Sequence, residues 1–365
     1  MTITVAFRTD ASFTIGSGHV FRCLTLADAL KSKGANCHFL CREYPGHLLD
    51  IIRNRGHAAT VISDGVADLS ASDHAFPDAL DYAWETDARQ SRGVMEKLRP
   101  DWLVVDHYGI DERWEAALRM NDCKIMVIDD LADRKHLCHL LLDQNLGRSA
   151  EDYRPLVAKQ CTVLTGPNFA LIRTEFSELR PWSLHRRQQS QSIGRLLITM
   201  GGVDAPNATC KVLQALNSCS LPAECCITVA MGLKAQWINH VREFAKNMHW
   251  PTEVLVNVED MAFRMGTSDL AIGAAGSTSW ERCCVGLPTI LIVLAQNQES
   301  GATALEVAGA AHLIGWVSDV DANLPLALKK LMTPGALSAM STRAGATTDG
   351  HGAQRVLVAM GLKNV

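Results

Sequence analysis

The feature that most constrains the fold of this chain is an alternation of short apolar runs with helical stretches. Between the first runs, apolar side chains recur at the spacing of one helix face, as in the segment 20–30, and Gly34 offers a stop. Continuous apolar strands separated by helices are typical of a parallel sheet that is covered on both faces. In the first half we predict strands at 3–7, 37–41, 59–62, 102–107, 124–129 and 139–144.

A polar, basic and glutamine-rich segment at 180–194 interrupts this alternation, which then restarts. We predict an N-terminal domain at 1–180, a linker at 181–194 and a C-terminal domain at 195–365. The last helix, near 352–360, is a candidate to cross back to the first domain. In the second half we predict strands at 195–200, 226–231, 254–258, 270–274 and 289–295.

The predicted fold class is α/β, with two Rossmann-like, doubly wound parallel-sheet domains facing one cleft. A length of 365 residues suits two domains, and 47% hydrophobic residues exclude a disordered chain. Because the net charge is −4, nothing favours nucleic acid or an anionic membrane as a partner. The longest uncharged run, 283–298, is shorter than the roughly 20 apolar residues of a membrane helix. Arg8 and Asp10 also interrupt the first apolar segment, so we expect a cytoplasmic protein without stable membrane association.

The twelve cysteines are predicted to be reduced and structural, because most of them lie in apolar runs and no CxxC pair occurs. The nearest metal-like cluster is His136, Cys138 and His139, and it lacks a second half at zinc-finger spacing. We therefore expect no metal and no cofactor.

The turn after the first strand is the first candidate site. Gly16 and Gly18 let the backbone approach a ligand closely, although they do not form a GxGxxG motif. His19 stands at the start of the following helix, where a neutral imidazole can accept a proton. The alternative is a polar helix-capping residue. We predict that His19 is a general base and that Gly16, Gly18 and Arg22 contact the substrate.

The segment 271–288 is the second candidate, because a strand leads through glycines into a helix that begins with hydroxyl side chains. Gly276, Ser277 and Thr278 are predicted to bind a pyrophosphate through backbone N–H groups, hydroxyls and the helix dipole. Glu281 lies early in the same helix and suits a ribose diol. The alternative is a simple capping box with a glutamate three residues after the cap.

Three further strand ends complete the predicted site. Gly201 and Gly202 follow the first strand of the second domain and are expected to contact the nucleotide. Asn297 and Gln298 follow a later apolar strand, where substrate contacts belong in this architecture. Asp106, His107 and Tyr108 end a strand of the first domain; Tyr108 is expected to reach a sugar, and His107 to be a structural neighbour.

Two such domains with phosphate-binding turns describe the GT-B architecture of nucleotide-sugar enzymes. Over nearly its whole length the chain resembles the UDP-2,4-diacetamido-2,4,6-trideoxy-β-L-altropyranose hydrolases of pseudaminic acid biosynthesis. The second-domain block also resembles the nucleotide-binding half of the peptidoglycan glycosyltransferase MurG. The motifs that carry the resemblance are RTDASFTIGSGHVFRCLTLADAL, IDDLADR, GPNFALIRTEF, GGVDAPN and GAAGSTSWERCCVGLPTILIVLAQNQ.

The resemblance implies an inverting, metal-independent hydrolase with His19 as its catalytic residue. Phe169, where the family pattern has tyrosine, and Asp143, where it has asparagine, are departures that bear on fine contacts. The resemblance further implies that Tyr108 and Asn297 lie near the sugar, that Arg173 reaches the substrate, and that Gly276, Ser277, Thr278 and Glu281 bind the nucleotide.

The expected reaction is attack of a water molecule, activated by His19, on the anomeric carbon of a UDP-sugar. UDP leaves toward the helix start at 276–278, which stabilises its growing charge. Two alternatives stay open at this point. One is a MurG-like glycosyltransferase that uses a sugar or lipid acceptor, and the other is a non-catalytic module that binds nucleotide sugars.

Overall fold

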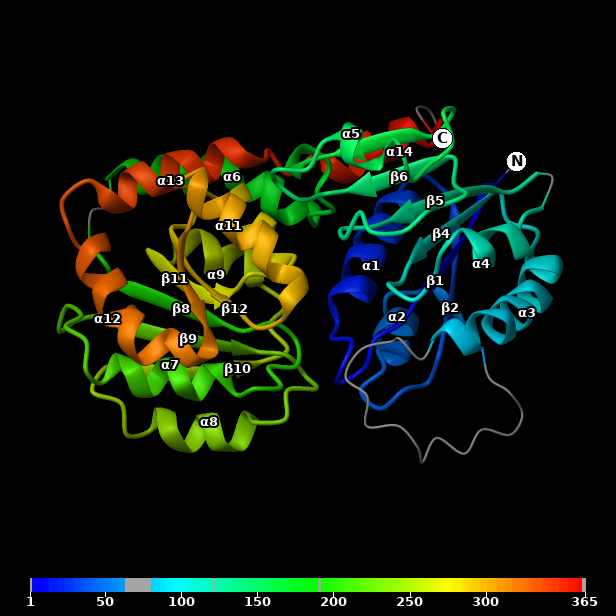
Figure 1. The fold of residues 1–365 in the computed structure, drawn as a ribbon. Coiled ribbons are helices and arrows are strands. Elements are labelled where there is room, and N and C mark those ends of the chain that lie inside the picture. Colours follow the sequence, from blue (N-terminus) through cyan, green and yellow to red (C-terminus); the bar gives the residue numbers. More distant parts are fainter. Residues whose placement is uncertain (1, 63–79, 121, 190–191, 363–365) are drawn as a thin grey trace. The chain divides into compact units, whose positions relative to one another are not determined.

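A computed structural model describes residues 2–62, 80–120, 122–189 and 192–362 of the chain. The chain divides into two compact units (Figure 1). The first unit comprises Met1–Leu171 together with Gly352–Val365, and the second comprises Ile172–His351.

The first unit is built on a parallel seven-stranded sheet with the order β3-β2-β1-β4-β5-β6-β7. The strand order reverses between β1 and β4, which pair directly, with Thr9 opposite Asp106. Such a reversal is where open α/β sheets bind ligands, beyond the carboxyl ends of the strands. The strands are β1 (Thr4–Thr9), β2 (Asn36–Cys41), β3 (Ala58–Val61), β4 (Trp102–Asp106), β5 (Lys124–Ile128), β6 (Leu140–Asp143) and β7 (Thr162–Thr165).

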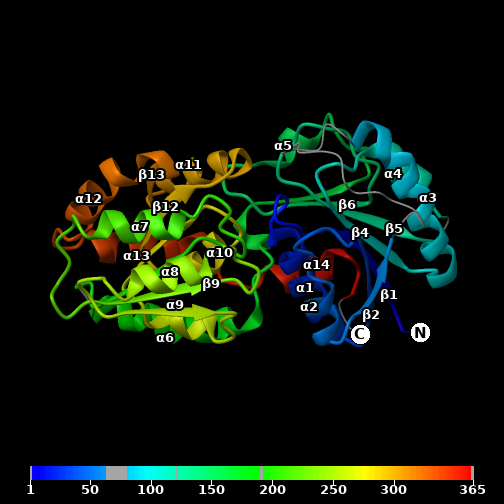
Figure 2. The same cartoon turned by 90° about the horizontal axis from the view of Figure 1, so that it is seen from below.

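Helices cover both faces of this sheet because its strands alternate apolar side chains between two cores. Val5 and Phe7 belong to the core beneath α1, α2 and α14, whereas Ala6 belongs to the core that includes α3, α4 and α5. Figure 2 shows α1, α2 and α14 on one side of the strands and α3 and α4 on the other. The helices are α1 (Gly18–Lys31), α2 (Leu49–Asn54), α3 (Leu80–Leu98), α4 (Glu112–Ala117), α5 (Ala150–Tyr153) and α14 (Gly352–Ala359).

The second unit repeats this plan with a parallel six-stranded sheet of order β10-β9-β8-β11-β12-β13. Its strand order reverses between β8 and β11, so a second switch point lies at the ends of these two strands. The strands are β8 (Arg195–Thr199), β9 (Cys226–Met231), β10 (Thr252–Val256), β11 (Leu270–Ala274), β12 (Thr289–Val293) and β13 (His312–Trp316).

Apart from α11, the helices of the second unit form two groups. One group joins α7 (Ala208–Leu216) to α8 (Ile238–Ala245) and α12 (Val320–Leu331). In the other, α6 contacts α9, α10 and α13. The bounds of these helices and of α11 are α6 (Thr174–Gln189), α9 (Met261–Thr267), α10 (Thr278–Cys284), α11 (Glu299–Val307) and α13 (Ala336–Thr347).

The segment predicted as an irregular linker, 181–194, differs from that prediction over most of its length. Residues up to Gln189 belong to α6, and positions 190–191 lie outside the described residues. The helical part of the segment shows no apolar period because its buried side chains, Ser183 and Arg187, are polar. Arg187 donates to the carbonyl oxygens of Met265, Ser268 and Val285, which satisfies the ends of two neighbouring helices.

The division of the chain also differs from the predicted boundaries. The structure separates the units between Leu171 and Ile172, rather than at 180. The terminal helix α14 is grouped with the first unit, and its Val356 and Leu357 are buried in the core beneath α1. Among the described residues, no helix combines the length and apolar character needed to cross a membrane.

Candidate active site

The first part of the candidate site is the turn that joins β1 to α1. Ser12 accepts hydrogen bonds from the N–H groups of Thr14 and Ile15 through its hydroxyl oxygen, and it pairs with Gly16 through the backbone. Gly16 has a φ of +83°, a conformation that favours glycine. This tight turn places His19 in the first turn of α1, where the imidazole is buried.

His19 is held by the carboxylate of Asp106, which ends β4. The Nδ1 atom of His19 lies 2.5 Å from Oδ1 of Asp106. Arg22 approaches the same Nδ1 at 3.2 Å, but its Nη2 also donates to that carboxylate oxygen at 2.6 Å. Because an unprotonated Nδ1 would repel the carboxylate at this distance, Nδ1 carries the proton and donates it to Asp106. In this tautomer Nε2 is the nitrogen that is left to act as an acceptor, as a general base requires.

Asp106 is a fully buried carboxylate. Burial alone would raise its pKa, but Arg22 and His19 outweigh burial through their charges and hydrogen bonds, so the pKa lies well below its usual range. Arg22 donates to both carboxylate oxygens, from Nε and Nη2 at 2.6 Å each. Its Nη1 donates to Asp130 at 3.0 Å. The substrate contact predicted for Arg22 stays a prediction, because the observed partners of its guanidinium are these two carboxylates.

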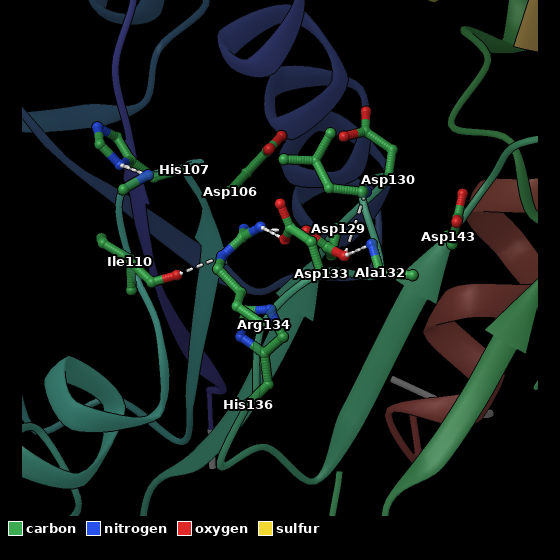
Figure 3. Close-up of polar contacts among 12 residues, drawn as sticks. Asp106, His107, Ile110, Asp129, Asp130, Ala132, Asp133, Arg134, His136 and Asp143 are labelled. Carbon is green, nitrogen blue, oxygen red and sulfur yellow. Dashed lines mark hydrogen bonds and ion pairs between the residues drawn. The ribbon is translucent and has the colours of Figure 1, made fainter. Parts of the chain in front are cut away.

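Asp130 belongs to a group of charged side chains beyond β5 (Figure 3). Asp129 accepts a hydrogen bond from the N–H of Ala132, and Arg134 lies 2.9 Å from its carboxylate. Arg134 also donates to the carbonyl oxygen of Ile110, which ties the loop after β5 to the loop after β4. These contacts fix the loop that presents Asp130 to Arg22.

His107 and Tyr108 follow Asp106 and occupy different positions. The Nδ1 atom of His107 accepts the N–H of Gly109 at 3.0 Å, and its Nε2 lies 3.4 Å from Asp10. Both ring nitrogens of His107 thus have partners within the first unit, and the structural role predicted for it stays a prediction. The Tyr108 ring meets the His19 ring edge-on, with centroids 4.6 Å apart. Tyr108 therefore lies beside the predicted base.

The second part of the candidate site is the turn from β11 to α10. Gly276 and Ser277 lie in this turn, and Thr278 begins α10. Arg282, which the sequence analysis did not single out, is almost fully buried beneath it. Its Nη2 donates to the carbonyl oxygen of Ala274 at 2.7 Å and to the hydroxyl of Ser279 at 2.9 Å. Burial lowers the pKa of Arg282 to about 10.

Glu281 and Arg173, which the sequence analysis assigned to ribose and substrate, pair with each other. Nε of Arg173 donates to Oε1 of Glu281 at 3.0 Å, and Nη1 lies 3.0 Å from Glu175. The guanidinium also lies 4.9 Å from the centre of the Phe176 ring. Arg173 thus orients the Glu281 carboxylate, and the substrate contact predicted for Arg173 stays a prediction.

The remaining predicted nucleotide contacts lie in the turn after β8. Gly201 has a φ of +83°, and a side chain at Gly232 would overlap the carbonyl oxygen of Gly202. The glycine at 232 therefore permits close packing of this turn. The carboxylate of Asp204 accepts the N–H groups of Ala208 and Thr209 at 2.7 and 3.0 Å, which caps α7.

Asn297 and Gln298 lie in a short 3₁₀ turn after β12. Oε1 of Gln298 accepts the N–H of Leu294 at 3.0 Å. A side chain added to Gly276 would lie 3.9 Å from Nε2 of Gln298, so the turns after β11 and β12 are neighbours. The structure thus brings these predicted substrate and nucleotide residues to one edge of the second sheet.

The side chains of the metal-like cluster in the first unit serve other contacts. His136 lies 2.7 Å from Glu115, and Nδ1 of His139 accepts the N–H of Ile125. The sulfur of Cys138 lies 3.5 Å from that of Cys161, and all twelve cysteines are free thiols. Over the described part of the chain, no group of three or more histidine, cysteine or acidic side chains is placed to hold a metal ion.

Comparison with known proteins finds several that are similar to this chain. Residues 197–356 match the glycosyltransferase family 28 C-terminal domain. The chain is 27% identical to the UDP-2,4-diacetamido-2,4,6-trideoxy-β-L-altropyranose hydrolase of Campylobacter jejuni, over 84% of this chain and 97% of that protein. It is 24% identical to the uncharacterized protein MJ1062 of Methanocaldococcus jannaschii, over 80% of this chain but only 56% of that longer protein. The resemblance inferred from the motifs is therefore confirmed.

Solved structures share the fold over almost the entire chain. The MurG structure from Acinetobacter baumannii superposes with a TM-score of 0.70 at 17% identity and covers 98% of this chain and 99% of that one. A structure described as an S. aureus MnaA-UDP co-structure gives a TM-score of 0.61 at 13% identity, over 99% and 98% of the two chains. The two-domain α/β GT-B fold predicted from the sequence is confirmed.

Proposed function

We propose that this protein hydrolyses a UDP-linked 2,4-diacetamido-2,4,6-trideoxy hexose at the anomeric C–O bond, without a metal ion. The observation that carries the proposal is the pair of His19 and Asp106 at the switch point of the first sheet, which leaves Nε2 of a neutral imidazole as an acceptor. The similarity to a hydrolase of that name supports the choice of substrate. We place the step in pseudaminic acid biosynthesis on the same similarity.

In the proposed reaction the oxygen of a water molecule forms a bond to the anomeric carbon. The bond from that carbon to the UDP oxygen breaks, and its electron pair leaves with UDP. The proton of the water passes to Nε2 of His19, while Asp106 stabilises the imidazolium that forms. A single displacement inverts the configuration at the carbon. UDP is a good leaving group and requires no general acid at neutral pH.

We assign UDP binding to the turns of the second unit. Gly276, Ser277 and Thr278 supply backbone N–H groups and hydroxyls, and Glu281 accepts hydrogen bonds from the ribose. Gly201 and Gly202 bring a second turn to the nucleotide. The match to the family 28 C-terminal domain supports this assignment, as does the similar fold of a protein described with bound UDP. Tyr108, Asn297 and Gln298 remain the proposed contacts to the sugar.

A MurG-like transferase is the second candidate, because the family 28 match and the MurG superposition favour it specifically. The two candidates differ in what happens when no acceptor is present. A hydrolase releases UDP steadily from the UDP-sugar in buffer alone. A transferase releases it only when an acceptor hydroxyl is added.

The proposed reaction is tested in ¹⁸O-labelled water with the UDP-diacetamido sugar as substrate. We expect the label at C1 of the released sugar, unlabelled UDP, and an anomeric configuration opposite to that of the substrate. Activity should persist in excess EDTA, because the turns after β8 and β11 contain no paired carboxylates. Label in the nucleotide, or UMP and sugar phosphate as products, would mean that the enzyme attacks phosphorus. A requirement for Mg²⁺ or Mn²⁺ would overturn the metal-free mechanism.

A further inference from the structure

Asp106, Arg22 and Asp130 form a line of alternating charge behind the proposed base, and only the last of them is partly exposed. His19 donates to Asp106, Asp106 accepts both arms of the Arg22 fork, and Arg22 donates to Asp130. The side chains of His19 and Arg22 are 8% and 7% exposed, that of Asp106 is fully buried, and that of Asp130 is 13% exposed. Charges removed from water in this way interact strongly.

The two charges next to His19 act on its protonation in opposite directions. A carboxylate in contact with an imidazole favours the imidazolium, whereas a nearby cation disfavours it. Asp106 and Arg22 are both in contact distance of Nδ1, at 2.5 and 3.2 Å. Because Arg22 binds both oxygens of Asp106, it also weakens the pull of that carboxylate on the ring proton. Asp130 in turn offsets part of the charge of Arg22.

We propose that Arg22 and Asp130 are positioning residues that set, through Asp106, the pH range over which His19 stays neutral and able to accept a proton. Arg22 extends that range toward acidic pH, and Asp130 limits the extension. The proposal rests on the function proposed above for its effect on hydrolysis. Its primary measurement, the titration of the His19 ring in the free protein, needs no turnover.

Other titratable groups face this line of charges, and each of them has identified contacts. The Tyr108 ring contacts His19 edge-on, and the buried Cys23 thiol lies 3.6 Å from Asp106. Burial, followed by the charge of Asp106, raises the pKa of Cys23 well above its usual range, so the thiol is neutral. On the β5 and β6 side lie three acidic groups and their cations: Asp129 with Arg134, Asp133 with Arg134, and Asp143 with Arg148. Beyond β1, His107 and Arg8 hold Asp10.

The test compares Arg22→Met with Asp130→Asn by NMR, following the His19 ring signal as a function of pH. The signal is identified by its loss in His19→Gln. We expect the titration midpoint to rise by about one pH unit in Arg22→Met, because the cation is lost. In Asp130→Asn it should fall by about half a unit, because Arg22 is then less compensated. If hydrolysis is established, the acidic limb of its pH–rate profile should move in the same two directions.

Arg42→Met is the matched control, because it removes a largely buried arginine at the same sheet edge whose partners are Asp87 and Gln90 rather than His19 or the loop that holds Asp130. This control variant should leave the midpoint of the His19 titration unchanged. A purely structural role for Arg22 and Asp130 predicts no shift, or shifts of the same sign, and either result would overturn the proposal. Should Arg22→Met fail to fold, Asp130→Asn alone decides, since asparagine has nearly the same shape as aspartate. Opposite shifts in a protein that hydrolyses no UDP-sugar would uphold this proposal and refute only the proposed reaction.

Discussion

Two buried arginines show how differently the two units build the carboxyl edges of their sheets. In the first unit, Arg22 is held by two carboxylates; burial lowers its pKa, but the charges of Asp106 and Asp130 raise it well above its usual value. In the second unit, Arg282 donates hydrogen bonds to a carbonyl oxygen and to hydroxyls, and burial lowers its pKa to about 10. At the first edge the buried cation is therefore compensated by carboxylates, whereas at the second edge the buried cation has neutral acceptors.

This difference suits two tasks. A cation that is compensated by carboxylates can fix the orientation of a base without needing an anionic ligand. A buried cation next to a turn of backbone N–H groups lacks such compensation, and an anionic ligand can provide it. We infer that the first unit is built for proton transfer and the second for binding a phosphate group. The following predictions test this division of roles, beginning with the largest effect.

His19→Ala should lower kcat by roughly 10²–10⁴-fold, the usual cost of losing a general base. The affinity for UDP should stay close to that of the wild type, because the residues assigned to UDP lie in the other unit. Steady-state kinetics and calorimetry with UDP measure the two effects separately. A variant that keeps more than half of the wild-type rate would remove His19 from the mechanism.

Glu281→Ala should weaken UDP binding with little effect on the rate at saturation. A hydrogen bond to a charged group contributes roughly 1.5–3 kcal/mol, which corresponds to a loss of about 10- to 150-fold in affinity. Glu175→Ala is the matched control, because Glu175 pairs with the same Arg173 but is half exposed. Equal affinities for UDP in both variants and the wild type would reduce Glu281 to a residue of the helix start.

Arg282→Met should weaken UDP binding by about tenfold and uridine binding much less, since the lost interaction is with charge. Calorimetry with UDP, UMP and uridine measures this dependence on ligand charge. If all three ligands lose affinity to the same extent, Arg282 only shapes the turn, and the contrast between the two edges has no electrostatic meaning.

Asp143→Asn tests an exception at the edge of the first sheet, where the pKa of this carboxyl is raised rather than lowered. The expected effect is on the free energy of unfolding. Asp143 is buried with Arg148 3.6 Å away, and burial raises its pKa to about 6. A carboxyl whose pKa is raised by folding favours the folded state below the unfolded value of about 3.9, and this contribution is lost as the pH rises through 6. The asparagine variant should therefore be more stable than the wild type at pH 8, by about 1–3 kcal/mol, and lose this advantage toward pH 4.

Urea denaturation at pH 4 and pH 8 measures this difference. Asp133→Asn is the control, because Asp133 is largely exposed and should show little dependence on pH. A stability difference for Asp143→Asn that does not change with pH would show that the buried carboxyl keeps its ordinary titration.

Much of the fold could be predicted because each core strand is a continuous apolar run of a few residues in the sequence. All six predicted strands in the first unit overlap β1 to β6 to within about two residues at each end. The strands β7 and β13 were missed. Both lie at sheet edges and are only partly buried, so their sequences lack a continuous apolar run. Helix α6 was missed because two of its three buried side chains, Ser183 and Arg187, are polar and donate to carbonyl oxygens, which leaves no apolar period.

The sequence by itself determined the turns that carry the candidate residues: a glycine turn before His19 and a glycine–hydroxyl turn before Glu281. Only the tertiary structure decided which side chains those residues meet. His19 and Asp106 are 87 residues apart, and they meet because the chain crosses over to lay β4 beside β1. Arg173 and Glu281 are 108 residues apart, and likewise no local pattern joins them. Periodicity and turn chemistry act over a few residues, whereas the partners that set charge and orientation are chosen by sheet order.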